Sequence, residues 1–151
     1  MPAYPYTIEN GHGEALTWLR VVHEAGGDRI EAEAVAQPGA GPPMHVHKLQ
    51  EEAARVVSGK MGYQLIDGQK LYAGPGELVV WPPGTAHKWW NAGDTELRMT
   101  GYRCRLLIRY QQPDGQLSDW LPPDQYETRT TDYLTNVTGA TEGQLPERPR
   151  R

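Results

Sequence analysis

The sequence has only one cysteine, Cys104, so no internal disulfide can form, and a lone free cysteine of this kind is expected to be a small buried side chain. No apolar run reaches the length of about 18 residues that a membrane-spanning helix needs. The first residues also lack the basic start and apolar core of a signal peptide. These absences predict a soluble, cytoplasmic protein without a membrane partner.

A broad positive surface is missing as well. The formal net charge is −4, and acidic and basic residues are interspersed along the chain. Nucleic acid is therefore not an expected partner, because binding to phosphates needs clustered lysine and arginine.

The composition favours turns and short strands over long helices. The chain has 151 residues, of which 38% are hydrophobic, enough for the core of one domain. The 17 glycines and 13 prolines close a series of short segments with alternating apolar residues. This pattern predicts an all-β sandwich or barrel, with the clearest strands at residues 29–36, 54–58, 61–66, 77–81 and 97–110.

The two parts of the chain differ in pattern. Residues 1–110 are predicted to form the β-barrel, with Asp67-Gly68 as a hairpin turn in which positive φ is tolerated. Residues 111–151 are polar and lack alternation, so they are predicted to be a partly irregular C-terminal extension with a solvated tail. One short amphipathic helix is possible there, on the spacing of Tyr126, Thr130, Tyr133, Leu134 and Val137.

Two histidines stand one residue apart in the segment GPPMHVHKLQEE, residues 41–52. In a strand, alternate side chains share a face, so His45 and His47 point the same way and can converge on one ion. Taken alone, the pair fits a polar strand face near a loop equally well.

The surrounding residues complete two motifs. The first comprises His45, His47, Glu52 and Gly59, with Gly39 or Gly41 as the opening glycine. The second, at residues 76–91, comprises Gly76, Pro82, Gly84, His87 and Asn91. With these motifs the stretch 39–91 resembles the cupin family. The opening glycine is the one departure, because Gly41 is closer to His45 than the family spacing requires. Gly39 has the required spacing.

The resemblance implies a jelly-roll β-barrel that holds one metal ion. The matching ligand positions are His45, His47, Glu52 and His87, a donor set suited to divalent Fe, Mn, Ni, Cu, Co or Zn with open coordination positions. Glu51 is one residue out of phase and is expected to point outwards, so it is a ligand only if a bulge shifts the register. Two further histidines, His12 and His23, lie outside the motifs and are expected to be surface or satisfied polar groups.

Strand parity indicates which residues line the pocket. Ala54 stands where many cupins have a large aromatic residue, so the cavity beside the metal is expected to be roomy. Tyr63 is the best candidate for a catalytic acid, although a core tyrosine is the alternative. The strand at 97–110 has mixed parity, so either Tyr102 and Cys104 or Leu97 and Met99 face the cavity. The predicted pocket residues are Ala54, Val56, Met61, Tyr63, Leu65 and Trp89.

The resemblance favours a metal-dependent dioxygenase-type oxidoreductase that acts on a small organic molecule. A non-redox isomerase, decarboxylase or cyclase and a small-molecule-binding cupin without catalysis are the alternatives, because one fold supports many functions. A regulator is disfavoured by the lack of a helix-turn-helix pattern, and a storage role by the intact ligands. A homodimer is expected through the outer sheet, with LTWLRVV, residues 16–22, as an edge strand.

Overall fold

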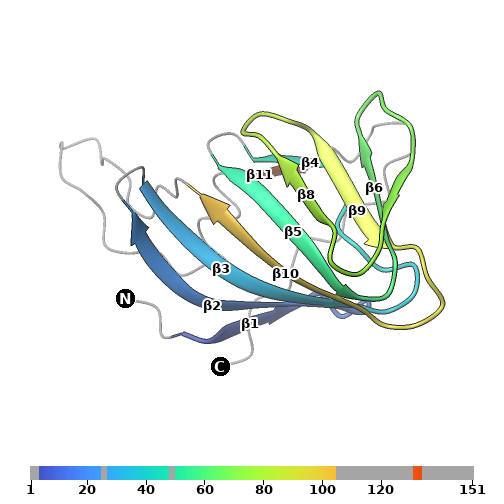
Figure 1. The fold of residues 1–151 in the computed structure, drawn as a ribbon, viewed down its shortest axis with the longest axis horizontal. Helices are drawn as coiled ribbons and strands as arrows, with labels where there is room; N and C mark the ends of the chain where they lie inside the picture. Colours follow the sequence, from blue (N-terminus) through green and yellow to red (C-terminus); the bar gives the residue numbers. More distant parts are fainter. Residues whose placement is uncertain (1–3, 25–26, 48–49, 105–130, 134–151) are drawn as a thin grey trace.

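The computed structural model describes residues 4–24, 27–47, 50–104 and 131–133, and this part of the chain is all β (Figure 1). Six strands form one sheet in the order β1 (Tyr6–Glu9), β2 (Glu14–Glu24), β3 (Gly27–Ala36), β10 (Leu97–Cys104), β5 (Glu51–Ser58) and β8 (Leu78–Trp81). Five strands form the second, in the order β11 (Thr131–Tyr133), β4 (His45–His47), β9 (His87–Asn91), β6 (Met61–Leu65) and β7 (Leu71–Ala73).

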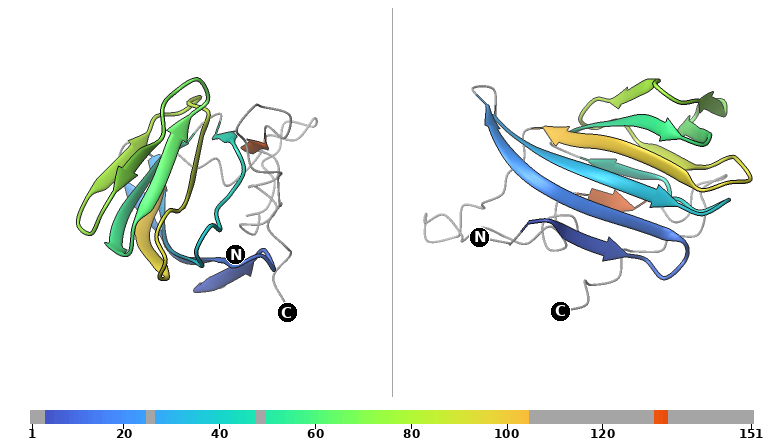
Figure 2. Two further views of the ribbon diagram at one scale, coloured as in Figure 1. Left: turned by 90° about the vertical axis from the view of Figure 1, so that its right-hand side faces the viewer. Right: turned by 60° about the horizontal axis from the view of Figure 1, so that its bottom comes forward.

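Every strand pair is antiparallel, and distant parts of the chain lie side by side. Strand β10 pairs with both β3 and β5, and β8 closes the far edge beyond β5. The large sheet curves strongly, and the second sheet stands against its concave side (Figures 1 and 2). This arrangement is a jelly roll, as the alternating pattern and the two motifs predict.

The core lies between the two sheets and is built from alternate residues of the strands. Ala34, Val56 and Leu97 face inwards from the large sheet and meet Met61 and Trp89 of the second sheet. All of these side chains are buried. A separate small cluster joins β1, β2 and β3 and is formed by Ile8, Trp18, Ile30 and Ala32.

The second motif contains the turns that its proline, glycine and asparagine residues predict. Gly84 has φ of 77°, the Thr85 N–H donates to the Pro82 carbonyl at 3.2 Å, and the Gly84 N–H donates to the His47 carbonyl at 2.8 Å. The turn before β9 is thereby tied to β4. The buried Asn91 closes the next turn, accepting from the Gly93 N–H and donating to the Thr95 carbonyl.

Three expectations need correction. The 61–66 and 71–73 strands do form a hairpin, but its tight turn runs from Leu65 to Gly68 and Gly68 is not among the glycines with positive φ. Residues 131–133, inside the predicted helix, instead form β11, whose backbone pairs with His45–His47 of β4 in an antiparallel ladder. Strand β2 is a sheet edge over only part of residues 16–22, since β1 pairs with it over Ala15–Trp18, whereas no described strand pairs with residues 19–22 on that side. The rest of the predicted helix lies outside the described residues.

No helix in the described ranges is long and apolar enough to cross a membrane.

Candidate metal centre

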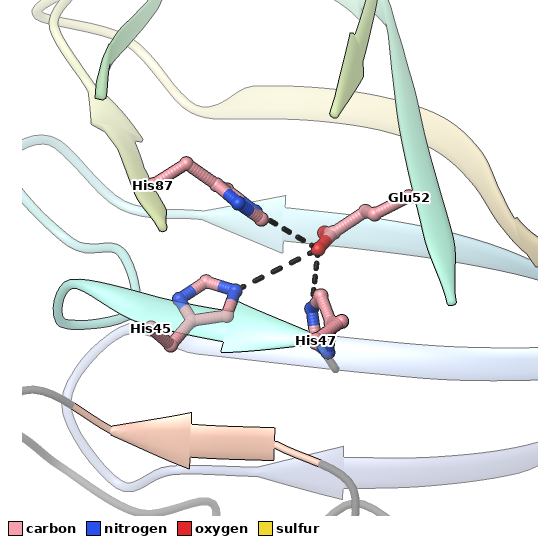
Figure 3. Close-up of side chains that lie close together, drawn as sticks. All are labelled: His45, His47, Glu52 and His87. Atoms are coloured by element: carbon pink, nitrogen blue, oxygen red, sulfur yellow. Dashed lines mark hydrogen bonds and ion pairs between the residues drawn. The ribbon is translucent and has the colours of Figure 1, made fainter. Parts of the chain in front are cut away.

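Four side chains from three strands converge inside the barrel (Figure 3). Two come from β4, whose His45 and His47 share a face because they are two residues apart. Glu52 comes from β5 and His87 from β9, where His87 is the backbone partner of His45. We call these four residues the His/Glu cluster. Their exposed fractions are 3%, 2%, 8% and 1%, so the cluster is buried.

All three histidines approach the same oxygen of Glu52. The distances from Glu52 Oε2 are 2.5 Å to His47 Nε2, 3.0 Å to His87 Nε2 and 3.6 Å to His45 Nε2 (Figure 3). The ligand atoms of the four residues all lie within 4.8 Å of one another. Donor atoms bound to one first-row ion at about 2.1 Å are separated by no more than about 4.2 Å, so this cluster is close to the required size.

Backbone carbonyls orient two of the imidazoles. His45 Nδ1 lies 2.7 Å from the Pro43 oxygen, and His87 Nδ1 lies 2.9 Å from the Thr85 oxygen. A carbonyl can only accept, so each Nδ1 carries the proton, and in the neutral ring Nε2 presents its lone pair to the cluster. This is the arrangement found in metal-binding histidines, where the second nitrogen is fixed by a hydrogen bond.

Burial makes the neutral imidazole the favoured form at His45. Desolvation lowers the pKa of His45 below its ordinary value of 6.5, against opposing contributions from the neighbouring Glu52. Neutral rings would point lone pairs at a buried carboxylate, which is unfavourable unless a cation lies between them. The donor set therefore fits a divalent ion, held by His45, His47, Glu52 and His87.

The indole ring of Trp81 stacks on the face of the His87 ring and holds its plane. Trp81, at the end of β8, is buried and stacks on His87 with ring centroids 4.3 Å apart and an interplanar angle of 6°. Tyr63 packs edge-on against the same indole at 6.2 Å. The stack restricts rotation of the His87 ring, and the motifs did not predict it, because Trp81 is brought there by pairing of β8 with β5.

A cavity that is partly open to solvent lies beside the cluster. His45 and Glu52 form part of its wall. A row of small residues across three strands makes the room, because Gly101 of β10 pairs with Ala32 on one side and Ala54 on the other. The apolar part of the wall is completed by Ile8, Leu16, Trp18, Ala34, Pro42, Ala53, Trp89 and Met99.

The predicted pocket residues fall into three groups. Ala54 and Trp89 line the cavity. Val56 and Met61 are buried in the core next to it, and Tyr63 packs against that core. Leu65 is 44% exposed, so its assignment to the pocket is wrong, because it is the last residue of β6, where the tight turn leads away from the barrel interior. A catalytic role for Tyr63 stays a prediction.

Other side chains lie as expected or settle open points. Glu51 is outside the cluster, with its Oε1 3.4 Å from the Tyr102 hydroxyl. His23 is exposed and pairs with Asp28 at 2.8 Å, and His12 is exposed. Met99 lines the cavity, with Leu97 buried in the core beside it; Tyr102 also borders the cavity. The side chain of Cys104 lies outside the described residues.

Comparison with known proteins agrees with this geometry. Residues 32–102, which contain the whole His/Glu cluster, match the family described as the cupin domain. This stretch of the chain is a cupin domain. No curated protein matches it.

Solved structures share the cupin fold at low sequence identity. An uncharacterized conserved protein with a double-stranded β-helix domain from Klebsiella pneumoniae is 21% identical, with a TM-score of 0.50 over 69% of this chain and 76% of that one. A predicted oxalate decarboxylase from Thermotoga maritima is 22% identical, with a TM-score of 0.55 over 68% and 92%. The capsular polysaccharide assembling protein CapF from Staphylococcus aureus is 21% identical, with a TM-score of 0.62 over 87% of this chain but 35% of CapF.

Proposed function

We propose that this cupin binds one divalent transition metal through the His/Glu cluster and acts as a dioxygenase-type oxidoreductase on a small organic molecule. The observation that carries the proposal is the contact between the cluster and the cavity: the same His45 and Glu52 that face the metal position also form the cavity wall. A ligand in the cavity is thereby placed against the metal site.

The chain's own residues would do three things for such a reaction. The carbonyls of Pro43 and Thr85 hold the His45 and His87 rings with Nε2 directed inwards. The mainly apolar wall leaves few polar groups around a ligand, which strengthens electrostatic interactions inside the cavity. A bound first-row ion would supply Lewis acidity and, if it is redox-active, one-electron chemistry with dioxygen.

Metal analysis combined with oxygen uptake tests this proposal. Protein purified without chelator, and protein loaded with Fe, Mn, Ni, Cu, Co or Zn, is assayed with phenolic and dicarbonyl compounds. We expect about one metal ion per chain and substrate-dependent oxygen consumption with a redox-active metal but not with Zn. The His47→Ala variant should lose both.

The other outcomes discriminate between functions. Metal binding without oxygen uptake by any compound would exclude the dioxygenase and favour a non-redox isomerase, decarboxylase or cyclase, or a binding protein. A wild-type protein that takes up none of the six metals would contradict the metal site itself.

Filling the cavity should separate ligand binding from metal binding. Ala54→Phe places a ring in the row of small residues, and we expect at least about tenfold weaker binding of an aromatic ligand, equivalent to about 1.4 kcal/mol. Metal content should not change, because Ala54 is not a ligand. Isothermal titration calorimetry on metal-loaded protein measures the effect. Val57→Phe, on the same strand but 53% exposed, is the control and should bind normally; equal binding by Ala54→Phe would refute the cavity as the ligand site.

A further inference from the structure

The cavity extends away from the His/Glu cluster to the hairpin between β1 and β2. Glu14, at the start of β2, forms part of the cavity wall together with Asn10. The strand register explains why. Leu16 and Trp18 pair with the inward-facing Ala34 and Ala32, and Glu14 has the same parity, so its side chain lies on the inner face of the sheet.

A buried amide holds the Glu14 carboxylate in place. Asn10 is 5% exposed, and its Nδ2 donates to Glu14 Oε2 at 3.0 Å. Its Oδ1 accepts from the backbone N–H groups of His12 at 2.8 Å and Glu14 at 3.1 Å. The Asn10 N–H donates to the Glu14 carbonyl at 3.1 Å. Asn10 therefore positions both the backbone and the side chain of Glu14, which reduces the entropy lost when a ligand binds the carboxylate.

The chemistry of the two ends of the cavity is different. At one end His45 and Glu52 face the metal position, and between the ends the wall is mainly apolar, with Leu16 and Trp18 next to Glu14 along β2. Glu14 is half-buried and lines the cavity. An ionised carboxylate is an acceptor only, and its hydrogen bonds to hydroxyl or ammonium donors are strong in apolar surroundings.

We propose that Glu14 is a specificity-determining residue that binds a hydrogen-bond donor, an ammonium or hydroxyl group, at the end of the ligand remote from the His/Glu cluster. This inference rests on the proposed function, because it takes the cavity as the substrate site. The ligand class is a small molecule with metal-binding oxygens at one end, an apolar body and a donor group at the other end. A ligand with a carboxylate at that far end is disfavoured by repulsion from Glu14.

A matched series of catechols tests the proposal in Zn-loaded protein, where no oxidation interferes. The series carries an alkyl arm of one to three methylenes that ends in either an ammonium or a methyl group. Isothermal titration calorimetry should show that the best ammonium compound binds at least about tenfold more tightly than its methyl counterpart, as for a hydrogen bond to a charged group. Glu14→Gln should remove this preference and leave binding of the methyl compounds unchanged.

Two further variants identify the carboxylate as the cause. Glu9→Gln removes the same charge from an exposed side chain of the same hairpin and should keep the preference. Glu14→Asp withdraws the carboxylate by one methylene. The ammonium compound that binds most tightly to this variant should therefore have a longer alkyl arm than the one preferred by the wild type. An unchanged preference in Glu14→Gln, or an equal loss in Glu9→Gln, overturns the role of Glu14.

The failure of the proposed function gives a different result. If the Zn-loaded protein binds none of the catechols, both the substrate site and the role of Glu14 are overturned. If the methyl compounds bind and the ammonium group adds no affinity in the wild type, the inference about Glu14 fails alone.

Discussion

Replacement of His87 by alanine is expected to weaken metal binding by about 10- to 100-fold or more. Loss of a residue that only hydrogen-bonds to a metal ligand already weakens binding by this amount. The imidazole is 1% exposed and its Nε2 lies 3.0 Å from Glu52 Oε2, so no solvent-facing group can substitute for it at short range. His45→Ala should have a similar effect, because the buried His45 Nε2 faces the same Glu52 oxygen at 3.6 Å. Competition with a chromogenic chelator measures the dissociation constants.

The control for this prediction is His12→Ala, which removes an exposed imidazole outside the cluster. That variant should bind metal as the wild type does. Circular dichroism checks that His87→Ala remains folded, because the substitution also leaves Trp81 without its stacking partner. Full metal occupancy in folded His45→Ala and His87→Ala variants would show that neither histidine is a ligand.

The second large effect is expected at Gly41. A Cβ atom there would lie 2.2 Å from the Trp89 carbonyl oxygen and 2.7 Å from the Trp90 Cα, both in the backbone of β9. Backbone atoms cannot move aside as a flexible side chain can, so Gly41→Ala should push the segment before β4 away from β9. We expect a loss of at least about 3 kcal/mol of unfolding free energy, the upper part of the range for overpacking.

Gly39→Ala is the matched comparison, two residues earlier. Gly39 has φ of 81°, and a Cβ there meets no atom within 4 Å. Its cost should be limited to the left-handed backbone conformation, about 1–2 kcal/mol. Thermal denaturation measures the difference. The Tm of Gly41→Ala should be lower than that of the wild type by about 6 °C or more, because each kcal/mol of lost stability lowers the Tm by about 2–4 °C in a chain of this size. Equal Tm values for the two variants would contradict the close contact with β9.

Gly39 and Gly41 show which features the motif spacing can predict and which it cannot. Both precede His45 in the first motif, and the spacing favours Gly39 as the family glycine. The structure gives each a separate reason: Gly39 makes a turn with positive φ, whereas Gly41 allows two backbones to approach closely. The second reason depends on a strand about fifty residues later, so no local pattern could have predicted it.

The pocket shows the same limit. Ala54 and Trp89 were predicted from strand parity, which is a local property, and both line the cavity. The assignment of Leu65 to the pocket is wrong, because strand parity does not indicate where a strand leaves the barrel. Trp81, Asn10 and Glu14 were not predicted, because they come to the site through pairing of β8 with β5 and of β1 with β2.

The sequence by itself determined the all-β pattern and the four residues of the His/Glu cluster. The period of two in a strand places His45 and His47 on one face, and the resemblance to the two cupin motifs adds Glu52 and His87. Only the tertiary structure decided that three Nε2 atoms meet one oxygen of Glu52, and that the cavity runs from this cluster to Glu14. The physical reason is that periodicity and spacing act within one segment, whereas the cavity wall is set by the register between strands distant in the chain.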